Sequence, residues 1–292
     1  MEQRRTSTGA TGRGQPRKRF VIHHMAAEPP PKVPRVRELQ DRPTQPIEPP
    51  EHVIAKLGDA KVVMAVDLET HDWDSSVPTK GLIGQFGHYT FRDEQVLSYA
   101  RIAQLGWVIG DADATSTPWI SKEYEILPVD FKISPKATQY HKITNEHAMS
   151  NGRHLRDVLE EFMHDMIHAH EAGGRVVAHQ LEFDAGIINN ELERLGLHKL
   201  NKLWREIARK GVCTMSPAIG RWLRSSQGQD TGSEVTKNTM GLMELVRWLV
   251  PVSEYLARQH HAAGADAQMH RLLYVALVNR CKGSTVQRDE AD

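Results

Sequence analysis

The sequence predicts an α/β domain built on a mixed five-stranded sheet, in which a three-strand meander is followed by parallel strands and helices flank the sheet. Three observations support this fold class. Apolar runs with strand spacing come first, strands then alternate with helical patterns, and glycine, proline or short polar segments separate them. A chain of 292 residues, of which 39% are hydrophobic, is long enough to bury a full core, and this excludes disorder throughout.

The strands of the meander are expected between residues 61 and 128. The run KVVMAVDLET at 61–70 is apolar until it ends in acidic residues, which is typical of a buried strand whose polar end emerges at the edge of a sheet. Segments 100–112 and 119–128 alternate between apolar and polar residues, and the polar stretch between them predicts a turn.

Helices and strands are expected to alternate from residue 155 onward. The segment LRDVLEEFMHDMIHAH has apolar residues at helical spacing, and Gly173 and Gly174 end the pattern. The remaining elements, in order, are a strand at 175–180, a helix at 183–196, a strand at 211–215, and helical patterns at 215–224, 239–250 and about 264–280.

The first 55 residues are expected to be a disordered basic and proline-rich tail. Residues 1–37 hold nine Lys and Arg against two Asp and Glu, a net charge of +7, whereas the other residues hold 28 basic and 35 acidic side chains, a net charge of −7. The overall charge of zero is therefore a cancellation. The basic triplet at 17–19 is compatible with a nuclear signal, an organelle transit peptide or a solvated tail with no targeting role.

The predicted domain organisation is a tail at 1–55, a folded domain at 56–282 with an insertion at about 71–98, and a disordered C-terminal tail at 283–292. No apolar run approaches the ~20 residues that span a bilayer, and no signal-peptide pattern opens the chain. Two cysteines, Cys213 and Cys281, are too few for a disulfide framework. We therefore expect no membrane partner and an intracellular, reducing compartment.

Acidic residues stand where three of the predicted elements begin or end. Asp67 and Glu69 are two apart near the end of the first strand, so that their side chains project from one face. Asp184 opens the helix after strand 175–180, and Asp266 lies near the start of the last helix. His261 precedes Asp266 by five residues, which on a helix is a rotation of roughly 140°, so we place His261 on the loop before that helix.

Each of these patterns occurs by chance in a chain of this composition, and any one acid alone is explained as a helix cap or a solvated loop residue. Together and in this order, VDLET, HQLEFDAGIINNEL and HHAAGADAQ resemble the motifs of the DnaQ-like 3′-to-5′ exonucleases of the DEDDh type, over roughly residues 60–280. The resemblance implies a ribonuclease-H-like fold.

The same resemblance implies a two-metal site that takes Mg²⁺ or Mn²⁺. Its ligands would be Asp67, Glu69, Asp184 and Asp266, and His261 would be the general base. Hard divalent cations prefer carboxylate oxygens, and two of them offset the mutual repulsion of four carboxylates.

The implied reaction is hydrolysis of phosphodiester bonds at the 3′ end of single-stranded DNA or RNA, with release of nucleoside 5′-monophosphates. The segment ISPKATQYHKITNEHA also resembles a family stretch in which a histidine approaches the substrate. The residues implied to contact the substrate are Leu68, Thr70, His141 and Phe183. The alternative is a catalytically inactive module of the same fold that binds nucleic acid or a protein partner.

The insertion at about 71–98 departs from the compact family pattern. It carries Trp73, Phe86, Tyr89 and Phe91, together with basic residues and glycines. It is compatible with a lid that stacks on nucleobases and equally with a surface hairpin whose aromatic residues pack on the domain itself.

Other candidate sites are weaker. His164 and His168 are four apart on a predicted helix, but they point away from its apolar face, and no third zinc ligand is evident. Cys213 lacks an activating partner and is expected in the core.

Overall fold

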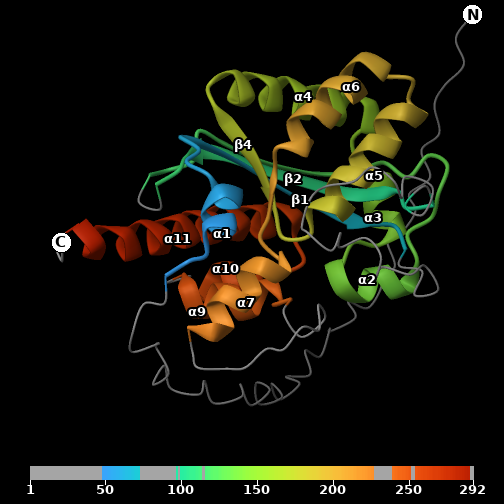
Figure 1. Cartoon of the computed structure of the whole chain (residues 1–292). Coiled ribbons are helices and arrows are strands. Elements are labelled where there is room, and N and C mark those ends of the chain that lie inside the picture. The colour runs from blue at the N-terminus through green and yellow to red at the C-terminus, as the bar shows by residue number, and fades with distance from the viewer. Residues whose placement is uncertain are drawn as a thin grey trace, which may run out of the picture. The chain divides into compact units, whose positions relative to one another are not determined.

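Figure 1 shows the computed structural model of the chain. The structure describes residues 48–72, 97, 99–113, 116–226, 239–250 and 254–289. Most of the expected N-terminal tail and nearly all of the insertion at 71–98 lie outside the described residues, so their predicted roles stay predictions.

The sheet has five strands in the order β3-β2-β1-β4-β5. Strand β1 pairs antiparallel with β2 and parallel with β4; β2 pairs antiparallel with β3, and β4 pairs parallel with β5. This confirms the predicted meander followed by parallel strands. The bounds are β1 Val62–Thr70, β2 Ile102–Asp111, β3 Ile120–Glu125, β4 Gly174–Ala178 and β5 Val212–Cys213.

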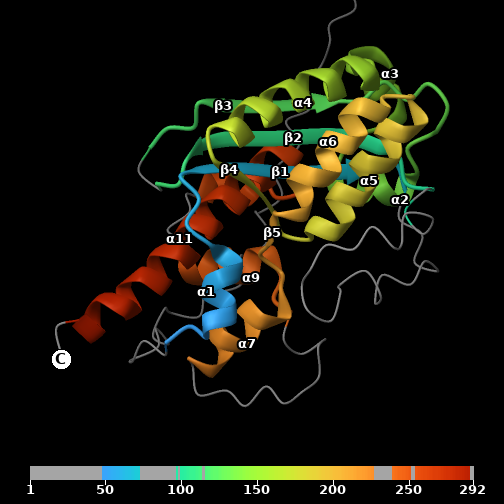
Figure 2. The same cartoon turned by 45° about the horizontal axis from the view of Figure 1, so that its top comes forward.

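Helices cover both faces of this sheet (Figures 1 and 2). The helices against one face are α4 Leu155–Glu171, α5 Leu181–Arg194 and α6 His198–Arg209. Those on the other face are α1 Glu51–Leu57, α7 Pro217–Ser225, α9 Leu242–Leu249 and α11 Ala263–Asp289. The remaining described helices are α2 Pro135–His141, α3 Asn145–Asn151 and α10 Glu254–Arg258.

Successive side chains of β1 point to opposite faces of the sheet and pack in two separate cores. Val62, Met64 and Val66 pack with the residues of α4 to α6. Val63 and Ala65 point to the opposite face and pack with α9 and α11. Asp67 and Glu69 continue this second set, because residues two apart on a strand share a face. The acids of β1 therefore emerge on the side that α11 covers.

Both ends of the folded region differ from the prediction. Helix α1 begins at Glu51, inside the segment expected to be a tail, and its Val53 and Leu57 are buried against the sheet and α11. The hydroxyl of Tyr274 donates to the carbonyl of Leu57 and ties α1 to α11. Helix α11 continues to Asp289, past the expected start of a C-terminal tail. Helix α6 was not predicted, although its Trp204 is fully buried.

A glycine allows α11 to begin directly on the sheet. Gly106 on β2 is the register partner of Asp67, and a Cβ at this position would collide with backbone atoms of Ala263 and Gly264. The start of α11 thus lies too close to β2 for a side chain at position 106.

We expect Gly106→Ala to lower the free energy of unfolding by about 1–3 kcal/mol, because the added methyl must push α11 off the sheet. Urea denaturation measures this change. Gly283→Ala is the matched control: a methyl group at this position would meet no neighbouring atom, and alanine in an exposed helix should stabilise by about 0.5–1 kcal/mol. Equal effects of the two substitutions would refute the close approach at Gly106.

Candidate functional site

Three carboxylates from two distant segments meet at the C-terminal end of β1. Asp67 and Glu69 lie on β1, and Asp266 lies in the first turn of α11. One oxygen of each lies within 4.8 Å of the others. Asp266 is only 4% exposed, and the side chains of Asp67 and Glu69 are 16% and 14% exposed. These three acids therefore form a largely buried group, and their expected role as metal ligands stays a prediction.

Side chains of the sheet hold the N-terminus of α11 in place. The backbone N–H of Ala263 donates to Gln104 Oε1 at 2.8 Å, and that of Gly264 donates to Glu123 Oε2 at 2.6 Å. These are N–H groups of a helix N-terminus, which lack partners within the helix. Glu123 and Asp67 both pair with Gly106, one from each side, so they share a face of the sheet. Polar residues of the meander thus fix where Asp266 lies.

Burial and mutual repulsion disfavour the ionised carboxylates. Burial raises the pKa of Asp67 well above its usual range, and the negative charges of Asp184, Asp266 and Glu69 raise it further. Burial likewise raises the pKa of Glu69 to about 8, reinforced by Asp266 and Asp184. A divalent cation would relieve both effects at once.

Asp184 stands slightly apart from this group. It lies in the first turn of α5 and is 4% exposed. Burial raises its pKa well above the usual range, while a hydrogen bond with the Leu68 backbone opposes the shift. The negative charge of Asp184 raises the pKa values of Asp67 and Glu69. Among the described residues, however, Asp184 is not part of the group of carboxylates whose oxygens lie within 4.8 Å of one another. Its expected role as a metal ligand stays a prediction.

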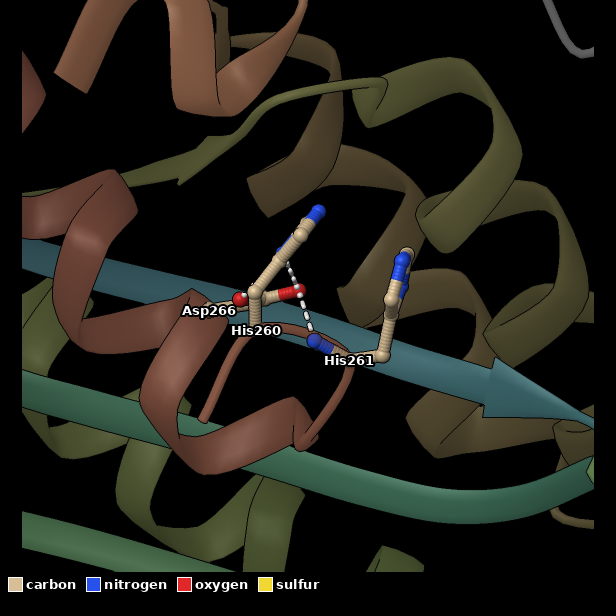
Figure 3. A group of neighbouring side chains, drawn as sticks. All are labelled: His260, His261 and Asp266. Carbon is tan, nitrogen blue, oxygen red and sulfur yellow. Dashed lines mark hydrogen bonds and ion pairs between the residues drawn. The ribbon is translucent and has the colours of Figure 1, made fainter. Parts of the chain in front are cut away.

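Two histidines flank Asp266 (Figure 3). The Nδ1 atom of His260 lies 3.0 Å from each carboxylate oxygen, and the backbone N–H of His261 donates to Oδ2 at 3.1 Å. The two rings are stacked, with centroids 3.9 Å apart. Because a carboxylate only accepts, the Nδ1 atom of His260 carries a hydrogen. The ring of His260 is thus engaged by Asp266.

His261 lies on the loop before α11, as the sequence predicted. Its ring lies near Glu69, and one ring nitrogen is also within 4.8 Å of ligand atoms of His260 and Asp266. Its backbone has a positive φ of 75°, which is uncommon outside glycine and turns the side chain toward β1. Its Nδ1 atom is 3.9 Å from Glu69 Oε1. Burial lowers the pKa of His261, and the charge of His260 lowers it further. Its imidazole is consequently neutral at neutral pH and able to accept a proton.

A third histidine, His270, lies one helical turn beyond Asp266. Its Nδ1 atom is 3.0 Å from the Val66 carbonyl oxygen, so Nδ1 carries the hydrogen and the Nε2 lone pair remains. This Nε2 atom is 3.7 Å from Asp67 Oδ1, is buried, and has no hydrogen-bond partner among the described residues. Burial lowers the pKa of His270 to about 4. When Asp67 is ionised, its carboxylate and this lone pair are both acceptors, and they face each other across this gap.

These observations fit a cation-binding site. The charges that act on Asp67 are all negative, and the Nε2 atom of His270 lacks a donor in the part of the chain that the structure describes. Asp67, Glu69 and Asp266 offer the oxygen ligands that Mg²⁺ and Mn²⁺ prefer.

The residues implied to contact a substrate occupy different environments. Thr70 ends β1, and the His141 ring stands beside it, with Nε2 3.2 Å from the Thr70 carbonyl oxygen. The Leu68 side chain is 5% exposed and packs in the core, and Phe183 is half-buried against the same core. The substrate contacts of these residues stay predictions.

The weaker candidates behave as the sequence indicated. The side chains of His164 and His168 are 69% and 66% exposed, so they point to solvent. Cys213 is buried, and burial raises the pKa of its thiol well above the usual range.

Sequence reasoning missed His260, His270 and Glu123. His270 is four residues after Asp266, and a helix places such residues on one face. Glu123 has no comparable signal, because only the registers of β1, β2 and β3 align it with Asp67 on either side of Gly106.

Without divalent cations, the free energy of unfolding should fall as the pH rises from about 6.5 to about 8, a range that lies above the titration of the histidines, whose pKa values burial lowers in the folded protein. Over this range the folded protein keeps the Glu69 proton that the unfolded chain, with an ordinary pKa of 4.5, releases. Rising pH therefore favours unfolding. Urea denaturation in EDTA at several pH values measures the slope.

Glu69→Gln should make this dependence less steep, while Asp67 and Asp184, whose pKa values are also raised, keep part of it. Glu171→Gln, at a side chain that is 70% exposed on α4, should leave the dependence unchanged. The assignment to Glu69 fails if the Glu69→Gln protein keeps the slope of the parent.

Comparison with known proteins supports the fold. No family model matches the sequence, and no curated protein matches it. Among solved structures, E. coli exonuclease I in complex with a dT13 oligonucleotide is similar, with a TM-score of 0.52 and 12% identity over 78% of this chain and 43% of that one. A product-bound structure of exonuclease I has a TM-score of 0.48, with 12% identity over 78% and 45% of the two chains. This chain thus spans less than half the length of the exonuclease I chains that it resembles.

The described helices include none that is long and apolar enough to cross a membrane. The architecture is the ribonuclease-H-like α/β fold that the sequence predicted.

Proposed function

We propose that the protein is a metal-dependent exonuclease that hydrolyses phosphodiester bonds at the 3′ end of single-stranded DNA or RNA and releases nucleoside 5′-monophosphates. The observation that carries the proposal is the meeting of Asp67, Glu69 and Asp266 beside His261 at the end of β1. Carboxylates and a neutral imidazole in one half-buried site are the groups that metal-assisted hydrolysis of a phosphodiester requires.

The likeness to E. coli exonuclease I supports the proposal. That protein shares the fold and was solved with an oligonucleotide. The fold by itself hosts many activities, so the argument for catalysis rests on the side chains at the site.

The site is expected to take two ions, Mg²⁺ or Mn²⁺. When bound, they would activate the attacking water and stabilise the charge on the leaving 3′ oxygen. Asp67, Glu69 and Asp266 would hold these ions, with Asp184 completing the predicted set of ligands. The raised pKa values of Asp67 and Glu69 describe the site without cations, where nothing offsets the repulsion.

His261 is the residue that we assign as the general base. Its lowered pKa keeps the ring neutral near pH 7, so it can take a proton from the attacking water. His260 has a different role in this proposal. Its Nδ1–H is directed at Asp266, and such a hydrogen bond orients a carboxylate ligand.

The direct test is cleavage of a 5′-labelled oligonucleotide. We expect the protein to shorten DNA or RNA from a free 3′ end in Mg²⁺ or Mn²⁺, to stop when EDTA is added, and to lose the activity in Asp67→Asn. If neither DNA nor RNA were cleaved in any of several divalent cations, the proposed exonuclease activity would be refuted. Oligonucleotide binding without cleavage would instead indicate the inactive module that the sequence left open.

The two adjacent histidines allow a paired test. His261→Gln should lower kcat by about 10²- to 10⁴-fold, as expected for loss of a general base. His260→Gln should mainly raise the Mg²⁺ concentration needed for half-maximal activity, by about 10- to 100-fold. Equal losses of kcat in the two variants would contradict this division of roles.

A further inference from the structure

Helix α6 and the residue that follows it are strongly basic, although the domain that carries them is acidic. Residues 198–210 hold five Lys and Arg and one Glu, a net charge of +4. The other residues between 38 and 292 hold 23 basic and 34 acidic side chains, a net charge of −11. Positive charge is thus concentrated on one helix, which lies with α4 and α5 on the side of the sheet away from α11 (Figure 2).

Four of these cations share one side of the helix and form what we call the basic face of α6. They are Lys199, Lys202, Arg209 and Lys210. All four are exposed, and none has an ion-pair partner in the described part of the chain. At 3.6 residues per turn they fall within roughly 100° of the helix circumference. The face therefore presents four unpaired positive charges to solvent.

The stability of the helix does not account for all of this charge. Lys199 lies in the first turn of α6, where the helix dipole disfavours a cation. The same turn contains no acid, and no side chain at the N-cap Leu197 caps the helix. Arg209 and Lys210, at the other end, are favoured by the dipole. The lysine at the start is thus better explained by an anionic ligand than by folding.

Hydrogen bonds hold the basic face at a fixed place relative to the candidate site. The indole N–H of Trp204 donates to the Ala185 carbonyl at 3.0 Å, and Asn201 Nδ2 donates to the Asn189 carbonyl at 3.0 Å. Both acceptors belong to α5, whose first turn carries Asp184. The outer side of α6 is therefore separated from α5 by roughly one helix diameter of 10–12 Å.

The side chains of this face fit phosphates and not bases. Lysine binds a phosphate as a point charge, and such contacts carry no sequence information. The aromatic residue of α6, Trp204, is fully buried and is not available for stacking on a base.

We propose that the basic face of α6 binds the phosphate backbone of a single-stranded nucleic acid, on the 5′ side of the 3′ end that the carboxylates hold. This inference rests on the proposed function and deepens it. The ligand is a nucleic acid and not an acidic protein, because a strand that ends beside Asp184 continues over the neighbouring surface. Glu206, an exposed acid on the same side of α6, opposes this ligand.

The test measures binding of the full chain to fluorescently labelled poly(dT) by anisotropy, in EDTA and at several salt concentrations. The double variant Lys199→Gln, Lys202→Gln should bind about 25-fold more weakly, because each cation near a phosphate contributes a factor of about 5. The slope of log K against log salt concentration should fall by about 0.7 for each lysine. Glu206→Gln should bind about 5-fold more tightly than the parent, because it removes a repulsion of similar size.

Two controls separate this surface from the carboxylates. Arg247→Gln removes an exposed cation from α9, on the other face of the sheet, and should bind poly(dT) as the parent does. Cleavage of a 5′-labelled thymidine trinucleotide in Mg²⁺ should be equal in the parent and the double variant, since so short a strand does not reach past α5 to the outer side of α6.

Equal affinities and equal salt slopes of the parent and the double variant overturn the inference, as does weaker binding by Glu206→Gln. Poly-L-glutamate that binds as tightly as poly(dT), with the same loss in the double variant, also overturns it, because the surface would then fit an acidic protein. These results leave the proposed function standing if the parent cleaves the trinucleotide. A parent that cleaves nothing, but whose binding of poly(dT) depends on the two lysines, overturns the proposed activity and not the binding surface.

Discussion

The docking of α11 onto the meander is the contact on which the candidate site depends. Gly106 leaves room for the backbone of Ala263 and Gly264, and Gln104 and Glu123 accept the N–H groups at the helix start. This arrangement carries Asp266 across about 200 residues of chain to the side of Asp67 and Glu69. Since neither segment forms the site alone, the site is a property of the folded domain.

The same contact concentrates negative charge where water is partly excluded. Asp67, Glu69 and Asp184 all have raised pKa values, and burial is the largest cause for each. The two apolar cores on either side of β1 hold the sheet and helices in place against this repulsion. A fold that keeps acids so close is organised for a positive ligand. The Nε2 atom of His270, which has no hydrogen-bond partner in the described part of the chain, supports the same conclusion.

Local periodicity predicts part of the arrangement of this site, whereas the choice of its residues comes from the resemblance of the sequence to the motifs of a known family. The two-residue repeat of a strand places Asp67 and Glu69 on one face, and the rotation of a helix places His261 on the loop before α11. The features that escaped prediction depend on tertiary structure. The register of three strands aligns Asp67, Gly106 and Glu123, and no spacing along the chain reveals it. Helix α1 escaped prediction because its two buried residues belong to a core that α9 and α11, far along the chain, largely build.

The most direct test of this account is a titration of Mn²⁺ into the protein, followed by calorimetry or by the loss of the free-ion electron paramagnetic resonance signal. The account predicts saturable binding in the parent that is lost in Asp266→Asn, a nearly isosteric change that should leave the circular dichroism spectrum unchanged. Saturable binding of equal strength in both proteins, or none in the parent, would contradict the claim that α11 completes a metal site at the end of β1.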